Sequence, residues 1–386
     1  MNGRMRPRRT VWVPLPHPGE SLVSWTDRTG AALGLPRARA AEALGLELPT
    51  GNPGLSLQNL TRWISDEAAA RVHAATGVPA EEVIALTVRR FQRTALSLDE
   101  PFGTKKEPPG GFRMLSKQHA YRYLSLYCPQ CLGEGRGWQL AWCLPWSVVC
   151  LRHRRYLHID CPNCGTPLDH RHGTLAPALC TGWVSTGSKP VPGRPGASRP
   201  AHRRCRKDLS RVPATRVHDQ RMLAAQQYVY SLLTAPEADS GGARQKLLEM
   251  RLLVIFATRL ATVEHLGPAD RAVIRRFGAF TAVRKSHPNP ALRMVMARRP
   301  WETRIHAAAI LIAHQIAVSG DPHAVLRSML PPPTRLAPST DELAATFQDA
   351  DWEHVASTFE PATLEALNAV ERKAQGHAGW RWSPAP

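Results

Sequence analysis

The apolar positions of the first hundred residues recur at helical spacing. Leu22, Trp25 and Leu33 share one face of a helix predicted over residues 21–33, and Gly34 ends it. The same reasoning predicts helices over residues 37–44, 66–76 and 80–90. A tight turn with glycine and proline joins the helices within each of two pairs, "ALGLPRARAAEAL" and "RVHAATGVPAEEVIALTV". Each pair is compatible with a DNA-reading helix-turn-helix, and equally with a small bundle that uses the turn only to pack.

Helical periodicity returns in the second half of the chain. It predicts helices over residues 222–233, 243–266, 268–280 and 301–318. Stretches rich in proline and glycine separate the parts of the chain. We therefore expect a mainly α fold, with helix-turn-helix-like helical domains around a central pair of small zinc-finger modules. The predicted parts are a basic tail (1–12), an N-terminal helical domain (13–110), a zinc-finger region (111–212), a C-terminal helical domain (213–330), and a proline linker with an acidic helical tail (331–386).

The charge of the chain predicts a polyanionic partner. Lysine and arginine total 50 against 31 acidic residues, which gives a formal net charge of +19. A positive charge of this size predicts binding to nucleic acid, and DNA is the first candidate. Residues 339–386 carry a net negative charge instead, with eight acidic residues against three basic ones. Phosphates repel that segment, so it is expected either to contact a protein or to pack as a capping helix on residues 301–318.

The ends and the apolar runs of the chain predict its location. No stretch approaches the roughly 20 apolar residues that a membrane span needs. The basic start lacks the apolar segment of a secretory signal. We expect a cytoplasmic, nucleoid-associated protein with no membrane partner.

Eight cysteines lie between positions 128 and 205, and five of them, together with His153, form three pairs with metal-ligand spacing. Two ligands separated by two residues curl around one ion, and a second such pair completes a tetrahedron. The first predicted site therefore takes Cys128, Cys131, Cys150 and His153. With four protein ligands and no open position, such an ion is structural rather than catalytic.

The second predicted site starts from Cys161 and Cys164, which Gly165 follows. Two further ligands are needed. We prefer Cys180 and Cys205, and His202 is the alternative to one of them. Cys143 lies between two tryptophans and is expected to be a small buried residue. The cofactor prediction is two structural Zn²⁺ ions.

Basic residues flank both predicted sites. A rigid zinc module that carries arginines is suited to bind phosphates, although a solvated basic face is the alternative. The candidate DNA-binding residues are Arg152, Arg154, Arg155, Arg203, Arg204, Arg206 and Lys207.

Motifs of catalysis are missing from the sequence. There is no GxxxxGK phosphate loop, no GxSxG, no HExxH and no GxGxxG. The cysteine-rich region also holds few carboxylates for a two-metal nuclease site. We expect a protein that is not an enzyme.

The order of these motifs resembles the TniQ family of transposition proteins, which includes TnsD-like target selectors. The resemblance runs over residues 13–209: the opening "VPLPHPGESLVSW", then "LYCPQCL", Trp142 and Trp146, "VVCLRHRRYLHIDCPNCGTPL", and a last cysteine before "RKDL". The family's metal ligands correspond to the first six predicted above. Family members often close with C-x-x-C-G, whereas this chain has His202-Arg-Arg-Cys205-Arg206, so the last ligand stays open.

The resemblance implies a non-catalytic DNA-binding adaptor that marks a target site and recruits a TnsC-like AAA+ ATPase, which engages the transposase. A homodimer and an RNA-guided effector complex are further partners that it allows. Two other functions compete with this one: a zinc-containing transcriptional regulator built from the same DNA-binding parts, and a nuclease or recombinase with dispersed carboxylates.

Overall fold

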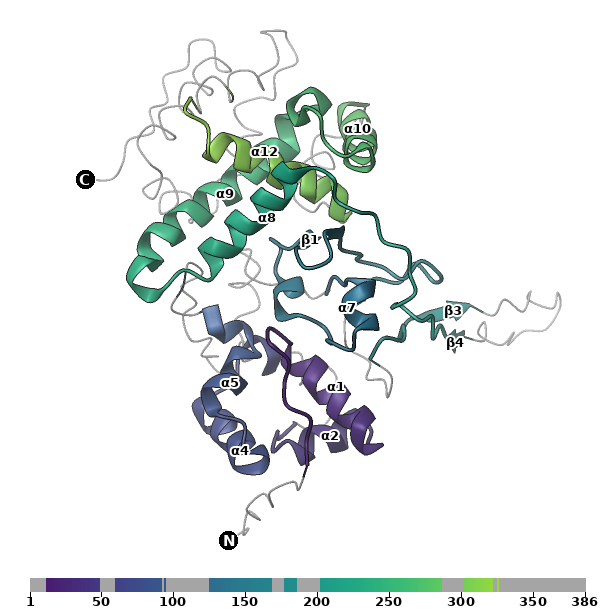
Figure 1. Cartoon of the computed structure of the whole chain (residues 1–386). Helices are drawn as coiled ribbons and strands as arrows, with labels where there is room; N and C mark the ends of the chain where they lie inside the picture. The colour runs from purple at the N-terminus through teal and green to yellow at the C-terminus, as the bar shows by residue number, and fades with distance from the viewer. Residues whose placement is uncertain are drawn as a thin grey trace, which may run out of the picture. The chain divides into compact units, whose positions relative to one another are not determined.

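The computed structural model describes residues 12–48, 60–91, 94, 125–168, 177–185, 202–286, 302–321 and 325. Helices dominate its regular structure, so the prediction of a mainly α fold is confirmed (Figure 1). The chain divides into two compact units, which meet in sequence between Thr215 and Arg216. No helix in the described ranges combines the length and apolarity that crossing a bilayer requires. The predicted boundary near residue 110 and the acidic tail over 331–386 lie outside the described residues.

Helix α1 (Leu22–Leu33) opens the first unit. The Ser21 side chain caps it by accepting the Ser24 N–H, and Gly34 ends it in the left-handed conformation, at φ 65°. Helix α2 (Arg37–Ala43) follows after a three-residue link. Gly30 is the point of close approach, since a Cβ there would meet the Leu35 carbonyl oxygen at 2.7 Å. The first predicted helix–turn–helix pair is therefore present and tightly packed.

The second pair consists of α4 (Asp66–Thr76) and α5 (Ala80–Ala85). A single helix was predicted over residues 80–90, but α5 ends early and a 3-10 turn, η1 (Val88–Phe91), replaces its second half. The cause is a tertiary hydrogen bond, because the Leu86 carbonyl accepts the N–H of Leu22 at 2.9 Å. Apolar residues of α1, α2, α4 and α5 form one core around Trp25, which is fully buried.

The described residues between 125 and 215 contain little regular structure. They hold α7 (Pro129–Gly133), the 3-10 helix η2 (Leu140–Cys143) and two short antiparallel strand pairs. Strand β1 (Val149–Cys150) pairs with β2 (Arg155–Tyr156), and β3 (Trp183–Ser185) pairs with β4 (His202–Arg204). Seven of the eight cysteines pack in or against one buried cluster of apolar side chains in this segment.

A buried carboxylate joins α1 to this segment. Glu20 is fully buried and pairs across a β-bridge with Gln139, while Ser21 donates its N–H to the Trp138 carbonyl. The carboxylate accepts the Ser24 hydroxyl at 2.8 Å and the Arg28 guanidinium at 2.8 Å. Ser24 Oγ in turn accepts the Trp138 N–H at 2.8 Å. The glutamate of the opening "PGES" therefore fixes the first helix on the cysteine-rich segment.

The second unit is a helical bundle around one apolar helix. Helices α8 (Gln220–Leu233), α9 (Ser240–Leu260) and α10 (Arg271–Ser286) pack on α12 (Thr303–Ala317), as do residues of η4 (Val263–Leu266). A short 3-10 turn, η3 (Glu237–Asp239), precedes α9. Figure 1 shows α8, α9 and α12 side by side. Residues 307–313 of α12 are buried all round, as expected for a helix enclosed by others.

Two predicted boundaries in this unit were wrong. Residues 243–266 form α9 and then η4, because Ala261 is extended at ψ 153°. Thr262 and His265 form a capping box at the new turn: the Thr262 side chain accepts the His265 N–H, and the Thr262 N–H donates to His265 Nδ1 at 3.0 Å. Helix α10 begins at Arg271 rather than Pro268 and continues to Ser286 rather than Phe280.

The joint at Glu20 leads to a stability prediction. Gly137 has φ 69°, and a Cβ there would collide with Glu20 Oε1 and Ser24 Oγ. We expect Gly137→Ala to destabilise the first unit by about 2–4 kcal/mol, since it adds overpacking to left-handed strain.

Gly135→Ala is the matched control for this prediction. Gly135 has φ 71°, but a Cβ there meets nothing within 4 Å. It should show only the backbone cost of about 1–2 kcal/mol. Denaturant unfolding of both variants measures the difference, and equal destabilisation would remove the close contact from the explanation.

Candidate metal centres and the basic surface

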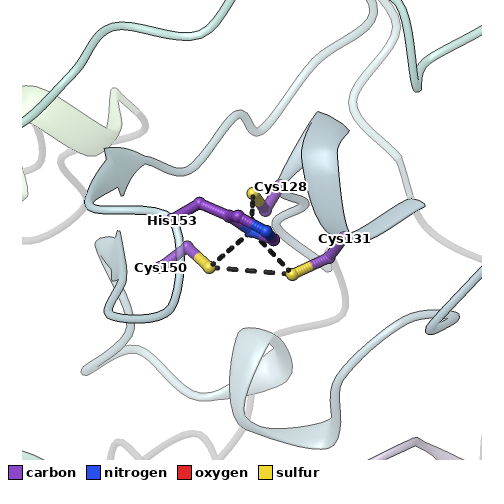
Figure 2. A group of neighbouring side chains, drawn as sticks. All are labelled: Cys128, Cys131, Cys150 and His153. Carbon is purple, nitrogen blue, oxygen red and sulfur yellow. Dashed lines mark hydrogen bonds between the residues drawn. The ribbon is translucent and has the colours of Figure 1, made fainter. Parts of the chain in front are cut away.

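The first cluster gathers Cys128, Cys131, Cys150 and His153 (Figure 2). Cys128 and Cys131 bracket the start of α7, Cys150 ends β1, and His153 lies in the turn between β1 and β2. Pro129 suits the first position of α7, where no N–H partner is needed. His153 Nδ1 lies 3.4 Å from the sulfur of Cys128, 3.3 Å from that of Cys131 and 3.6 Å from that of Cys150.

These distances match the edges of a tetrahedron around one ion. With metal–sulfur bonds near 2.3 Å and metal–nitrogen bonds near 2.0 Å, sulfur and nitrogen stand about 3.5 Å apart and two sulfurs about 3.8 Å. The Cys131 and Cys150 sulfurs are 3.7 Å apart, and the cysteines carry no disulfide. Hydrogen bonds from the Cys128 and Cys131 thiols lower the pKa of Cys150, so the cluster favours a thiolate there. The donor set and its spacing fit a zinc-type ion.

Glu134 orients the histidine of the first cluster. Its Oε1 lies 2.8 Å from His153 Nε2, and its Oε2 accepts the Arg152 guanidinium at 3.0 Å. The hydrogen bond to His153, with a contribution from Arg152, lowers the pKa of Glu134. A carboxylate that holds the outer ring nitrogen fixes the tautomer in which Nδ1 faces the thiols.

The second cluster consists of Cys161, Cys164, Cys180 and Cys205. The sulfurs of Cys161 and Cys205 are 3.7 Å apart, and those of Cys164 and Cys180 also 3.7 Å. These four thiols lie close enough to complete a tetrahedron without His202. The backbone of His202 pairs with Ser185 across the β3–β4 ladder.

Backbone and side-chain N–H groups surround the second cluster. Gly182 donates its N–H to the Cys180 sulfur at 3.3 Å, and the Asn163 amide donates to the Cys205 sulfur at 3.2 Å. Burial raises the pKa of Cys205, but the hydrogen bonds from Asn163 and from the Lys207 N–H outweigh it and lower the value to about 7. At Gly182 a Cβ would meet the Cys164 sulfur at 2.9 Å, so the backbone can approach only as glycine.

Cys143 belongs to neither cluster. It lies in η2 and is buried, which raises the pKa of its thiol to about 11. The thiol therefore stays protonated near neutral pH.

The candidate DNA-binding residues differ in whether their charged groups already have a partner within the chain. Arg152 bonds Glu134, Arg155 donates to the Ala214 carbonyl at 2.7 Å, and Arg204 stacks on Trp183 with its guanidinium carbon 4.0 Å from the ring centre. Four others are exposed, and no described residue pairs with their charged groups: Arg154, Arg203, Arg206 and Lys207. Arg154 and Arg206 have positive φ, 50° and 54°, in the turns beside His153 and Cys205.

Sequence reasoning missed the residues that support the clusters. Glu134 follows Cys131 by three positions, and one helical turn carries it toward His153, but its role depends on the β1–β2 turn folding back. Asn163 lies in the turn between Cys161 and Cys164. The sequence signal for its role is that its side-chain amide can donate a hydrogen bond to a nearby sulfur. Gly182 gives no signal beyond its being glycine.

Fold and clusters together define a mainly helical protein that carries a Cys₃His and a Cys₄ site of the zinc type. A family model described as TniQ matches residues 11–157. That segment is a TniQ domain, which confirms the resemblance and indicates a protein associated with transposition and DNA binding. The match covers the N-terminal helices and the first cluster and ends before the second, although the resemblance was expected to reach residue 209. Comparisons with curated proteins and with solved structures gave no match.

Proposed function

We propose that the two clusters hold one structural Zn²⁺ ion each. The first ion would be bound by Cys128, Cys131, Cys150 and His153, and the second by Cys161, Cys164, Cys180 and Cys205. Zinc supplies folding energy here rather than reactivity, because four protein ligands leave no position for water or substrate. The support is the ligand spacing, together with the N–H donors and the carboxylate that hold the ligands in place.

Metal analysis tests this proposal. The purified full chain should contain two zinc ions, and Cys128→Ser or Cys161→Ser should lose one ion and unfold its module. Structural zinc contributes on the order of 10 kcal/mol to folding of such small modules. Cys143→Ser is the matched control and should keep both ions. A chain prepared without chelators that holds one ion or none would contradict the proposal.

We further propose that the protein is a non-catalytic DNA-binding adaptor of transposition. The TniQ match over residues 11–157 carries this proposal, because the family is associated with transposition. The adaptor would mark a target site on DNA and recruit a TnsC-like AAA+ ATPase, which engages the transposase. The acidic segment after residue 338, outside the described residues, is our candidate for protein contact because phosphates repel it.

The basic surface supplies the DNA contacts in this proposal. Arg154, Arg203, Arg206 and Lys207 project from turns and a strand that the clusters hold rigid, so a phosphate meets side chains whose backbones are already ordered. Such contacts fix position on the duplex without reading its sequence. Arg152, Arg155 and Arg204 already have partners within the chain, so we assign them a secondary part.

A salt titration tests the surface. Each phosphate neutralised contributes about −0.9 to the slope of log affinity against log salt. We expect Arg203→Gln/Lys207→Gln to make that slope shallower by about 2, equally on unrelated duplexes. Arg39→Gln/Arg211→Gln is the control, since both arginines are exposed but paired with Glu42 and Asp208. Equal slopes for the two double variants would show that the arginine and lysine near Cys205 are merely solvated.

Recruitment is tested with the AAA+ ATPase encoded nearest to this chain. ATPase bound to immobilised duplex should increase when the full chain is present, and removal of residues 339–386 should reduce this gain while DNA affinity is kept. An ATPase that loads equally with and without the chain would contradict the adaptor role. Reproducible nicking of supercoiled DNA with Mg²⁺ would contradict the non-catalytic assignment.

A further inference from the structure

Helix α10 carries an exposed basic face in the second unit. Its sixteen residues include five basic ones and no acidic one. Val273, Phe277 and Phe280 are buried, whereas Arg271, Arg275 and Arg276 are exposed. The helix therefore turns its apolar side to its own bundle and these three arginines to solvent.

The three arginines differ from several arginines of the first unit. Arg28, Arg37 and Arg89 form ion pairs with Glu20, Asp27 and Asp66. Among the described residues, no acidic side chain pairs with Arg271, Arg275 or Arg276. The nearest acid along the chain, Asp270, accepts the His218 N–H at 3.2 Å. Three cations within one and a half turns of helix are thus left for an external anion.

The packing of α10 holds this face in place. The helix contacts α12 and η4. At Gly278 a Cβ would lie 3.3 Å from Val263 Cγ1, so η4 crosses α10 closely. Beyond the arginines the exposed side continues with Ala279, Ala282 and Val283, of which the two alanines let another molecule approach the backbone.

The chemistry of this face selects among classes of ligand. A lipid surface would need an exposed apolar stripe, and the apolar stripe of α10 is buried against the bundle. A protein partner would need several apolar side chains to bury at the interface core, and this face offers one large apolar side chain, Val283, among arginines and alanines. A polyanion needs only the cations, and a helix about 10–12 Å across fits the major groove of B-DNA, which is about 12 Å wide.

We infer that α10 is a second contact surface for duplex DNA, with Arg271, Arg275 and Arg276 bound to phosphates. The inference rests on the proposed DNA-binding function and assigns part of it to a unit outside the TniQ match.

Paired variants of the full chain test this surface. Arg271→Gln/Arg275→Gln should make the salt slope shallower by about 1–2 and weaken affinity on the order of tenfold near 0.15 M salt. The control Arg244→Gln/Lys246→Gln removes the same charge from α9. It should leave both quantities unchanged, and the melting temperature should stay the same for all variants.

A photo-crosslinking residue gives a second readout that does not depend on charge. Benzoylphenylalanine at Ala279 of α10 should crosslink to duplex DNA, whereas the same residue at exposed Ala224 of α8 should not. Unchanged affinity in the α10 variant, or crosslinking to single-stranded RNA or protein in place of duplex, would overturn the inference. If the α10 variant behaves as wild type while Arg203→Gln/Lys207→Gln weakens binding, only this inference fails. If the wild-type chain binds no duplex at low salt, the proposed function fails as well.

Discussion

The convergence of eight cysteine and histidine side chains into two clusters of four is the constraint on which the first unit depends. The described residues between 125 and 215 have two short strand pairs and brief helical turns, too little regular structure to fix the chain path. The ligands join segments that are far apart in sequence, since Cys161 and Cys205 meet across 44 positions. Their side chains are also part of the apolar cluster of this segment. The clusters thus take the place that a large apolar core has in other domains.

The joint at Glu20 extends this order to the helices. A carboxylate buried without partners would be strongly destabilising, but Glu20 accepts hydrogen bonds from Ser24, Arg28 and the His17 N–H. Its neighbours bond the backbone around Trp138, which lies in the same apolar cluster as the cysteines. The opening motif of the TniQ domain therefore links α1 to the segment that the metal ligands hold. The same contacts hold the turns beside the two clusters in place, so the backbone positions of the basic residues in these turns are also fixed.

Patterns of neighbouring residues predicted most of the helices and helix ends that depend only on neighbouring residues. Gly34 and the predicted range 66–76 gave helix ends that the structure also shows, because capping needs only a few neighbouring residues. The predictions failed where residues far apart in the sequence form a hydrogen bond or a contact. Helix α5 stops because Leu22 takes a carbonyl that a longer helix would use.

In the two cysteine clusters, too, local sequence predicted some features, whereas others depend on distant residues. Spacing by two residues identifies paired ligands, since both lie in one tight turn. Choosing between Cys180 with Cys205 and a site that uses His202 needs the β3–β4 ladder and the loop that returns to Cys161, and neither has a signal in the sequence. Glu134 was missed for the same reason. The exposed arginines of α10 were visible in sequence, but only the burial of its opposite side distinguishes them from an ordinary solvated helix.

Amide hydrogen exchange of the full chain with and without metal tests the central claim most directly. We predict that removing zinc increases exchange throughout residues 125–215 and at α1, whose capping residue bonds the Trp138 backbone. Protection of α8, α9 and α12 should remain, because their core contains no metal ligand. Unchanged protection of residues 125–215 after complete metal removal would contradict the claim that the clusters hold this unit together.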